Sequence, residues 1–219
     1  MANKTVVEYT PSQRDAVCDY LHEQFGESEN GFITHEINSE YVHTDVLRID
    51  NEEGKVFGTF GMGARKMRIP VPQLEDEQRA ELVMYASPDM DKDGNSPVGK
   101  GSMQICSELT HLSKYPFEND TWLSAGHTIN ASKQFTDQFG FDFFFFYPAI
   151  YEPLELKSLG KINFLLAIPI YKAERDWMAN HPGQNAEMRF MEAYLDWADE
   201  SGSYAEVNVS REVIIPEID

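Results

Sequence analysis

A run of aromatic residues in the second half of the chain constrains the fold more than any other feature. Residues 141–147 read Phe-Asp-Phe-Phe-Phe-Phe-Tyr. Successive side chains of a β-strand point to opposite faces, so these aromatic rings cannot all share one face. Such a strand is either buried on both faces or buries one face and exposes the other to a partner. We favour burial on both faces, which requires a sheet with packed cover on each side.

The remaining elements follow from apolar periodicity and from turn residues. Thr10 and Pro11 begin a helix in which apolar residues recur every four positions, and Gly26 ends it. The pattern predicts further helices over 102–114, 171–180 and 185–198, and strands over 31–37, 80–86, 121–125, 141–147 and 161–169. It also predicts a hairpin over 41–61 with its turn at 50–54, a polar loop at 87–99 and a weak edge strand within 206–215.

Strands and helices are intermixed without regular βαβ alternation. This order predicts an α+β (mixed α/β) fold, in which helices pack against a mixed, mostly antiparallel sheet. The chain of 219 residues has no internal repeat and no long linker, so residues 1–219 are interpreted as one domain.

The charge balance bears on the class of partner. Asp and Glu total 37 against 18 Lys and Arg, which gives a net charge of −19. Such a field repels nucleic acid and anionic membranes and attracts a basic protein, although a merely soluble acidic surface would have the same composition. The N-terminus lacks the apolar stretch of a signal peptide, and the apolar runs are too short to span a bilayer. Cys18 and Cys106 both lie in apolar helical patterns, which indicates buried thiols and a cytoplasmic protein.

Motifs for catalysis are weak. The glycine-rich segment 58–63 lacks the Lys-Ser/Thr ending of a phosphate loop, so it predicts a tight bend where another backbone approaches closely. His43 and Asp45 share one strand face, and Glu81 and His127 could complete a metal site if the fold brought all four together. The alternative is a polar pair at a sheet face. We therefore assign no catalytic residue, no metal and no cofactor, and keep a metal-dependent hydrolase only as an alternative.

Five short motifs, in this order, resemble the Suppressor of fused family over roughly residues 25–181. They are His43-Thr-Asp45, Thr59-Phe-Gly61-Met62, Ala80-Glu81-Leu82, Gly126-His127-Thr128 and Pro169-Ile170 followed by Glu174. Larger animal members carry a second, C-terminal domain that this chain is too short to contain. It therefore resembles the short bacterial form.

The resemblance implies a protein-binding function. Animal members of the family hold an extended peptide by adding it to a sheet edge, and short bacterial members are regarded as immunity proteins in toxin systems. The expected partner is thus a protein such as a basic toxin domain, with no nucleic acid, no membrane and no assigned oligomeric state. A regulatory interaction domain outside any toxin system is a further alternative.

The motif residues are expected to gather in one polar cluster, which either contacts the partner or holds the fold together. Its members are His43, Asp45, Thr59, Gly61, Met62, Glu81, Gly126, His127, Thr128 and Glu174. If the role is structural, His127→Ala should cost roughly 1–3 kcal/mol of stability by leaving a buried partner unpaired.

Overall fold

The computed structural model of the chain describes residues 5–27, 31–51, 54–91, 99–182, 185–201, 207 and 211–216. Within these residues seven strands form one sheet in the order β1-β2-β3-β4-β7-β6-β5. The strands are β1 Phe32–Thr34, β2 Asp45–Asp50, β3 Lys55–Phe60, β4 Ala80–Ala86, β5 Thr128–Asn130, β6 Phe143–Leu156 and β7 Gly160–Ile170. Only the β4–β7 pair is parallel among these neighbours, so the predicted mixed, mostly antiparallel sheet is confirmed.

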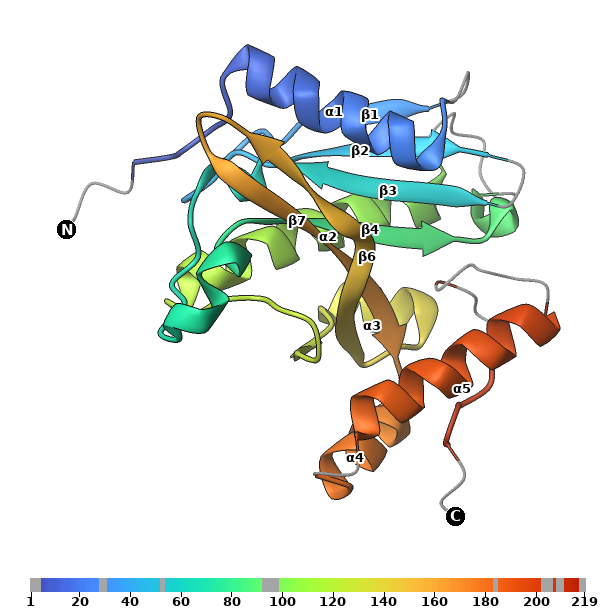
Figure 1. Cartoon of the computed structure of the whole chain (residues 1–219). Coiled ribbons are helices and arrows are strands. Elements are labelled where there is room, and N and C mark those ends of the chain that lie inside the picture. The colour runs from blue at the N-terminus through green and yellow to red at the C-terminus, as the bar shows by residue number, and fades with distance from the viewer. Residues whose placement is uncertain are drawn as a thin grey trace.

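Helices cover both faces of the sheet (Figure 1). The helices are α1 Pro11–Phe25, α2 Lys100–Glu118, α3 Lys133–Phe139, α4 Lys172–Asn180 and α5 Ala186–Ser201. Short 3₁₀ turns lie at η1 Met62–Ala64, η2 Pro72–Glu77 and η3 Pro88–Asp91. Helices α2 and α3 pack on one face, while α1 covers β2–β4 and the tip of the β6–β7 hairpin on the other face. Helices α4 and α5 cover the rest of that second face.

The aromatic run forms β6 and is buried on both faces, as predicted. Phe144 packs against Phe135 of α3 with ring centroids 4.8 Å apart. Its neighbour Phe145 points the other way and meets Phe190 of α5 edge-on at 5.7 Å. A buried Phe stabilises the fold by about 1.5–3 kcal/mol relative to an exposed one. Because its rings pack into the cores on both faces of the sheet, β6 joins these two cores.

The predicted hairpin is also present. Asp50 pairs with Lys55 at its closed end, and Asp45 pairs with Phe60 at its open end. Alternation sends Val46 into the core under α2 and Leu47 into the core under α1. The buried strand predicted over 80–86 coincides with β4.

Some local predictions were wrong. Residues 121–125 form a loop, and the strand begins only at Thr128. The short helix α3 was not anticipated, although Ser132 caps it by accepting a hydrogen bond from Phe135 N (3.2 Å). Cys106 is buried as expected, whereas Cys18 is only half-buried.

The C-terminal prediction is tested only in part. Val207 forms an isolated parallel bridge with Ala86, and residues 211–216 contain no strand. The rest of the predicted edge strand, much of the loop at 87–99 and two residues of the hairpin turn lie outside the described residues. No helix in the described part of the chain is both long and apolar enough to cross a membrane.

Candidate functional site

The motif glutamate of β4 forms the centre of a buried hydrogen-bond network. The Glu81 side chain has no exposed surface. Its Oε1 accepts hydrogen bonds from Tyr9 Oη (2.7 Å), Gly61 N (2.9 Å) and Gly63 N (3.0 Å), and its Oε2 accepts one from Thr59 Oγ1 (2.7 Å). Burial raises the pKa of this carboxyl, while the four hydrogen bonds oppose that shift. Glu81 therefore ties the N-terminal segment, the end of β3 and the following turn to β4.

The glycines of this turn are required by close approach. Gly61 has φ +146°, and a Cβ there would lie 2.0 Å from the carbonyl oxygen of His43 and 2.8 Å from Thr44 Cα. A Cβ on Gly63 would lie 2.4 Å from the hydroxyl oxygen of Tyr9. The interpretation of the glycine-rich segment as a tight bend against another backbone is confirmed.

Asp45 forms a second buried centre, at the start of β2. Its carboxylate is paired with Arg14 Nη1 of α1 at 2.8 Å and contacts His35 Nδ1 at 3.0 Å and His43 Nε2 at 3.2 Å. The backbone N–H of Glu36 donates to the same carboxylate at 2.9 Å. With only 1% of its side chain exposed, Asp45 joins α1 and the segment after β1 to the sheet.

Glu174 forms a third centre, at the first turn of α4. It accepts hydrogen bonds from Tyr171 N (2.8 Å) and Ile214 N (2.8 Å). Arg211 donates to it through Nη1 (2.5 Å) and Nη2 (2.9 Å), and both side chains of this ion pair are fully buried. The pair holds the C-terminal segment 211–216 against α4.

The Gly126-His127-Thr128 motif lies elsewhere, at the start of the edge strand β5. Gly126 N donates to Phe146 O (2.9 Å), and Phe146 N donates to His127 O (3.0 Å). The His127 ring is partly exposed and meets Trp122 edge-on at 5.3 Å, and Thr128 is exposed. Strands β7 and β6 separate β5 from β4 and Glu81.

The expected single cluster is therefore divided among three places. His43, Asp45, Thr59, Gly61 and Glu81 lie together at the open end of the β2–β3 hairpin, and Met62 beside them is buried in the apolar core. Residues 126–128 lie at the β5 edge, and Glu174 lies at α4. The four residues of the metal alternative do not converge, and no group of three or more His, Cys, Asp or Glu side chains in the described residues has the geometry to hold a metal ion.

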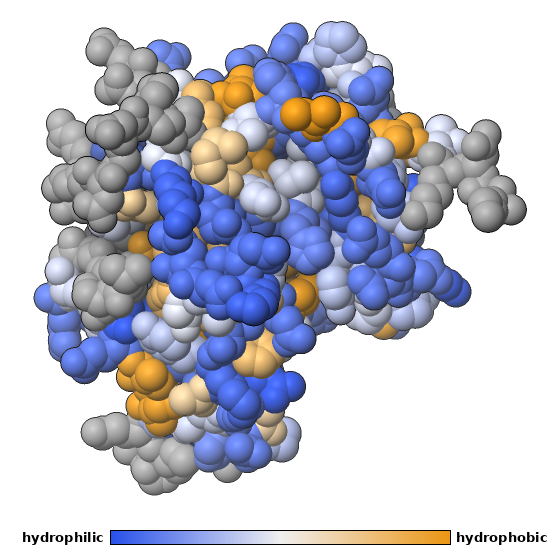
Figure 2. Space-filling view, turned by 180° about the vertical axis from the view of Figure 1, so that it is seen from behind, coloured by the Kyte–Doolittle hydropathy of each residue, from blue (hydrophilic) through white to orange (hydrophobic). Residues whose placement is uncertain are grey.

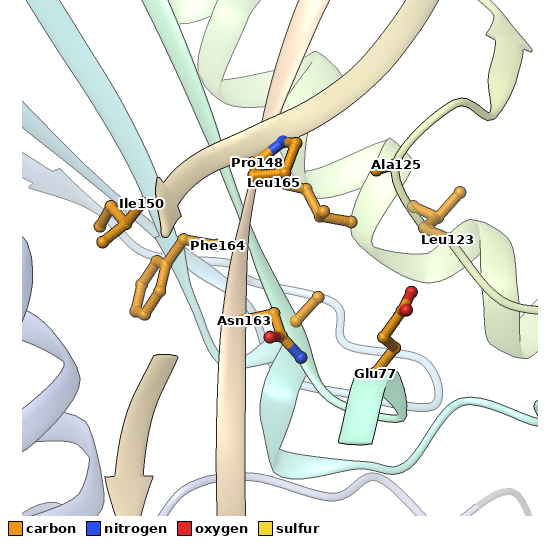
Figure 3. A pocket seen from close by; sticks show the side chains of 9 residues that line it. Glu77, Leu123, Ala125, Pro148, Ile150, Asn163, Phe164 and Leu165 are labelled. Carbon is orange, nitrogen blue, oxygen red and sulfur yellow. The ribbon is translucent and has the colours of Figure 1, made fainter. Parts of the chain in front are cut away.

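A pocket opens between the loop 121–126, which leads into β5, and strands β4, β6 and β7 (Figure 3). We call it the Leu123 pocket; its volume is about 210 Å³. Its apolar walls come from Ala80, Leu123, Ala125, Pro148, Ile150 and Leu165. It forms because the β6–β7 register shifts between Pro148 and Ile150 and because proline has no N–H for the ladder.

Polar groups line one side of this pocket. Figure 3 shows Leu123 and Leu165 facing each other, with the Glu77 carboxylate below them and Asn163 on β7. Glu77 accepts a hydrogen bond from Ser124 Oγ, and Asn163 Nδ2 donates to Asp76 O (2.8 Å). The volume is below that of a typical small-molecule site and matches one large side chain, with a carboxylate placed to meet a cation beside it.

The geometry defines an α+β domain whose motif carboxylates are buried in its framework and whose sheet ends, within the described residues, at β1 and β5. The family model for Suppressor of fused protein (SUFU) matches residues 40–199. The chain therefore belongs to the Suppressor of fused family. Comparison with curated protein sequences gave no match.

Solved structures agree with this assignment. A Suppressor of fused homologue from Neisseria gonorrhoeae is 16% identical with a TM-score of 0.62, covering 95% of this chain and 100% of its own. A chain of the Sufu–Fu complex is 11% identical with a TM-score of 0.61, covering 92% of this chain and 91% of that one. Drosophila Suppressor of Fused is 12% identical with a TM-score of 0.64, and 94% of this chain matches 52% of that protein. These likenesses show the fold.

The sequence did not reveal which residues the motif carboxylates bind. Tyr9 lies 72 positions before Glu81, and Arg211 lies 37 positions after Glu174. Neither belongs to a recognisable motif. The only available signal was the presence of an arginine and a tyrosine in otherwise unassigned terminal segments.

Proposed function

We propose that this chain holds an extended segment of a partner protein along the outer edge of β5, with one apolar side chain in the Leu123 pocket. The observation that carries the proposal is the position of residues 126–128. Apart from the half-buried His43, they are the motif residues that the framework does not bury, and unlike His43 they lie at a terminal strand of the sheet, next to Ala125 of an apolar pocket.

The backbone geometry supports strand addition. β5 is terminal in the sheet, and in the described residues no strand pairs with its outer side. Thr128 and Asn130 are exposed, so an approaching segment would meet little steric hindrance. Backbone hydrogen bonds then supply affinity, and a pocket for a single side chain supplies specificity. The Sufu–Fu complex is a precedent for protein binding by this fold.

The charge indicates the partner's chemistry. A net charge of −19 speeds encounter with a basic protein and opposes binding to polyanions. A basic toxin that acts on nucleic acid would present such a surface, so we propose that the chain is an immunity protein that neutralises a cognate toxin. The Glu77 carboxylate would meet a Lys or Arg next to the apolar side chain.

The test uses the purified chain and the product of the neighbouring gene in isothermal titration calorimetry. Ala125 is exposed and lines the pocket, so Ala125→Phe fills it from the rim with little disturbance of the core. The matched control is Ala179→Phe, at an exposed position of α4. We expect Ala125→Phe to weaken binding at least tenfold and the control to change it less than twofold.

Two outcomes would contradict the proposal. Equal affinity of the Ala125→Phe variant and the parent chain would remove the Leu123 pocket from the interface. A bound partner whose toxicity is unchanged by the chain would leave protein binding intact and end the immunity role.

A further inference from the structure

A second groove lies at the opposite end of the sheet, between β1 and α2. We call it the β1 groove; its volume is about 410 Å³. Thr34, His35 and Glu36 form one wall. The other wall is a stripe along α2 made of Met103, Cys106, Ser107, Thr110, His111, Lys114 and Glu118. The groove shares no lining residue with the Leu123 pocket.

Two contacts fix the direction of this groove. Thr34 Oγ1 donates to Cys106 Sγ at 3.4 Å, and Glu36 forms an ion pair with Lys114. Thr34 contacts position 106 of α2 and Glu36 contacts position 114, so the edge segment and the helix run side by side in the same direction. From position 103 to position 114 the helix rises about 16 Å, which equals about five residues of an extended strand.

Among the residues that the structure describes, no strand pairs with the outer side of β1. β1 is terminal in the sheet, and it pairs with β2 on its inner side from Phe32 to Thr34. Phe32 faces α2, since it packs on the core beneath that helix. The alternate residue Ile33 points the other way and is 39% exposed. In a strand added outside β1, every second side chain would therefore point toward the α2 stripe.

Exposed apolar side chains mark the same region. Ile37 just beyond β1 is 92% exposed, and Met103 on the α2 stripe is 45% exposed. Ile37 is the most exposed of the large apolar residues described. Seen from behind, the surface is largely hydrophilic, with apolar patches along its upper rim and at its lower left (Figure 2). Ser107 and Thr110 add hydroxyl groups between these apolar positions.

We propose that the β1 groove binds a second extended segment, about five residues long, from a basic protein with apolar residues at alternate positions. Charge selects this occupant. Two copies of a chain with net charge −19 repel each other, which opposes pairing of β1 with β1 of another copy. A cationic segment is attracted by the same field, and its backbone can pair with the open edge.

The test uses the full chain labelled with ¹⁵N and a nonapeptide in which lysine and valine alternate. We expect the peptide to shift backbone amide signals of residues 32–36 and of the α2 stripe. A second peptide with the same sequence carries N-methyl groups on every other backbone nitrogen, which keeps charge and side chains but prevents strand pairing. It should bind at least tenfold more weakly. Equal binding of the two peptides would overturn the proposal, because the contact would then be purely electrostatic.

Variants locate the contact. Ser107→Arg places a long cation in the groove, and Gln138→Arg makes the same charge change at an exposed position of α3. We expect at least a tenfold loss for Ser107→Arg and less than a twofold loss for Gln138→Arg. Ile37→Lys, at the almost fully exposed position, repeats the test without altering the helix. Equal effects of Ser107→Arg and Gln138→Arg, or amide shifts confined to β5, would overturn the proposal. Ala125→Phe should leave this binding unchanged, so failure at the β1 groove is separable from failure at the β5 edge.

Discussion

Replacing Gly61 by alanine tests whether the Thr59–Met62 motif is framework or contact surface. Gly61 has φ +146°, a conformation that costs a residue with a Cβ about 1–3 kcal/mol. The new Cβ would also lie 2.0 Å from the carbonyl oxygen of His43, which is backbone and cannot rotate away. Relieving such a clash by shifting the backbone costs about 1–3 kcal/mol more.

The shift would also disturb the hydrogen bond from Gly61 N to Glu81 Oε1 (2.9 Å). A hydrogen bond to a charged group contributes about 1.5–3 kcal/mol. These contributions sum to roughly 3.5–9 kcal/mol. The sum is comparable with the whole stability of an ordinary domain, about 5–15 kcal/mol. We therefore expect Gly61→Ala to lose most of its stability or to fail to fold at 37 °C.

Urea unfolding monitored by circular dichroism provides the measurement. The control is Gly140→Ala, because Gly140 has φ +82° and an added Cβ there meets nothing within 4 Å. The control should lose only about 1–2 kcal/mol, from the left-handed conformation alone. If the two variants lose the same free energy, the close approach of the two backbones is not what requires glycine at 61.

Three further predictions concern two buried carboxyls and the partly exposed His127. Burial raises the pKa of Glu81 in the folded state above its value in the unfolded state. The contribution of Glu81 to folding stability is therefore fully present below the unfolded pKa and is lost as pH rises through the folded pKa. Urea titrations should show that the parent chain loses stability relative to the Glu81→Gln variant between pH 4 and pH 7. A gain in the relative stability of the parent would show that the hydrogen bonds to Glu81 outweigh its burial. Arg211→Met leaves the Glu174 charge buried without its cation and should lower the free energy of unfolding in urea by about 3–5 kcal/mol. Adding Glu174→Met should restore part of that loss. No recovery in the double variant would refute this prediction. His127→Ala should cost no more than about 1.5 kcal/mol, the contribution of its ring contact with Trp122, and a larger loss by thermal unfolding would reveal a framework role.

Elements with strong local patterns could be predicted from the sequence. The strand at 80–86 matched because its apolar run is continuous and ends at Ser87-Pro88. Alternation in the hairpin placed Val46 and Leu47 on opposite faces. The helix at 133–139 has signals at both ends, Ser132 as its cap and Gly140 in the left-handed conformation. Its seven residues are too short for periodicity to stand out.

The site could be predicted only in part, because strand order is a long-range property. The sequence placed His127 beside Glu81, but β4 pairs in parallel with β7 and the β6–β7 hairpin then lies between β4 and β5. No local pattern encodes a parallel pairing between strands about 80 residues apart. The same reasoning explains why the contacts of Tyr9 and Arg211 escaped prediction.

The three buried carboxylates separate stability from binding in this fold. Asp45 holds α1 through Arg14, Glu174 holds the C-terminal segment through Arg211, and Glu81 holds the N-terminal segment through hydrogen bonds alone. The charges of Asp45 and Glu174 are thus balanced inside the protein, and the net charge of −19 comes almost entirely from other acidic residues. In the proposed interaction, that surface field acts over distance and would govern how fast a basic partner arrives, while the terminal strands of the sheet would determine which segment remains bound. Substitutions at the motif carboxylates should thus change binding only through the folded fraction.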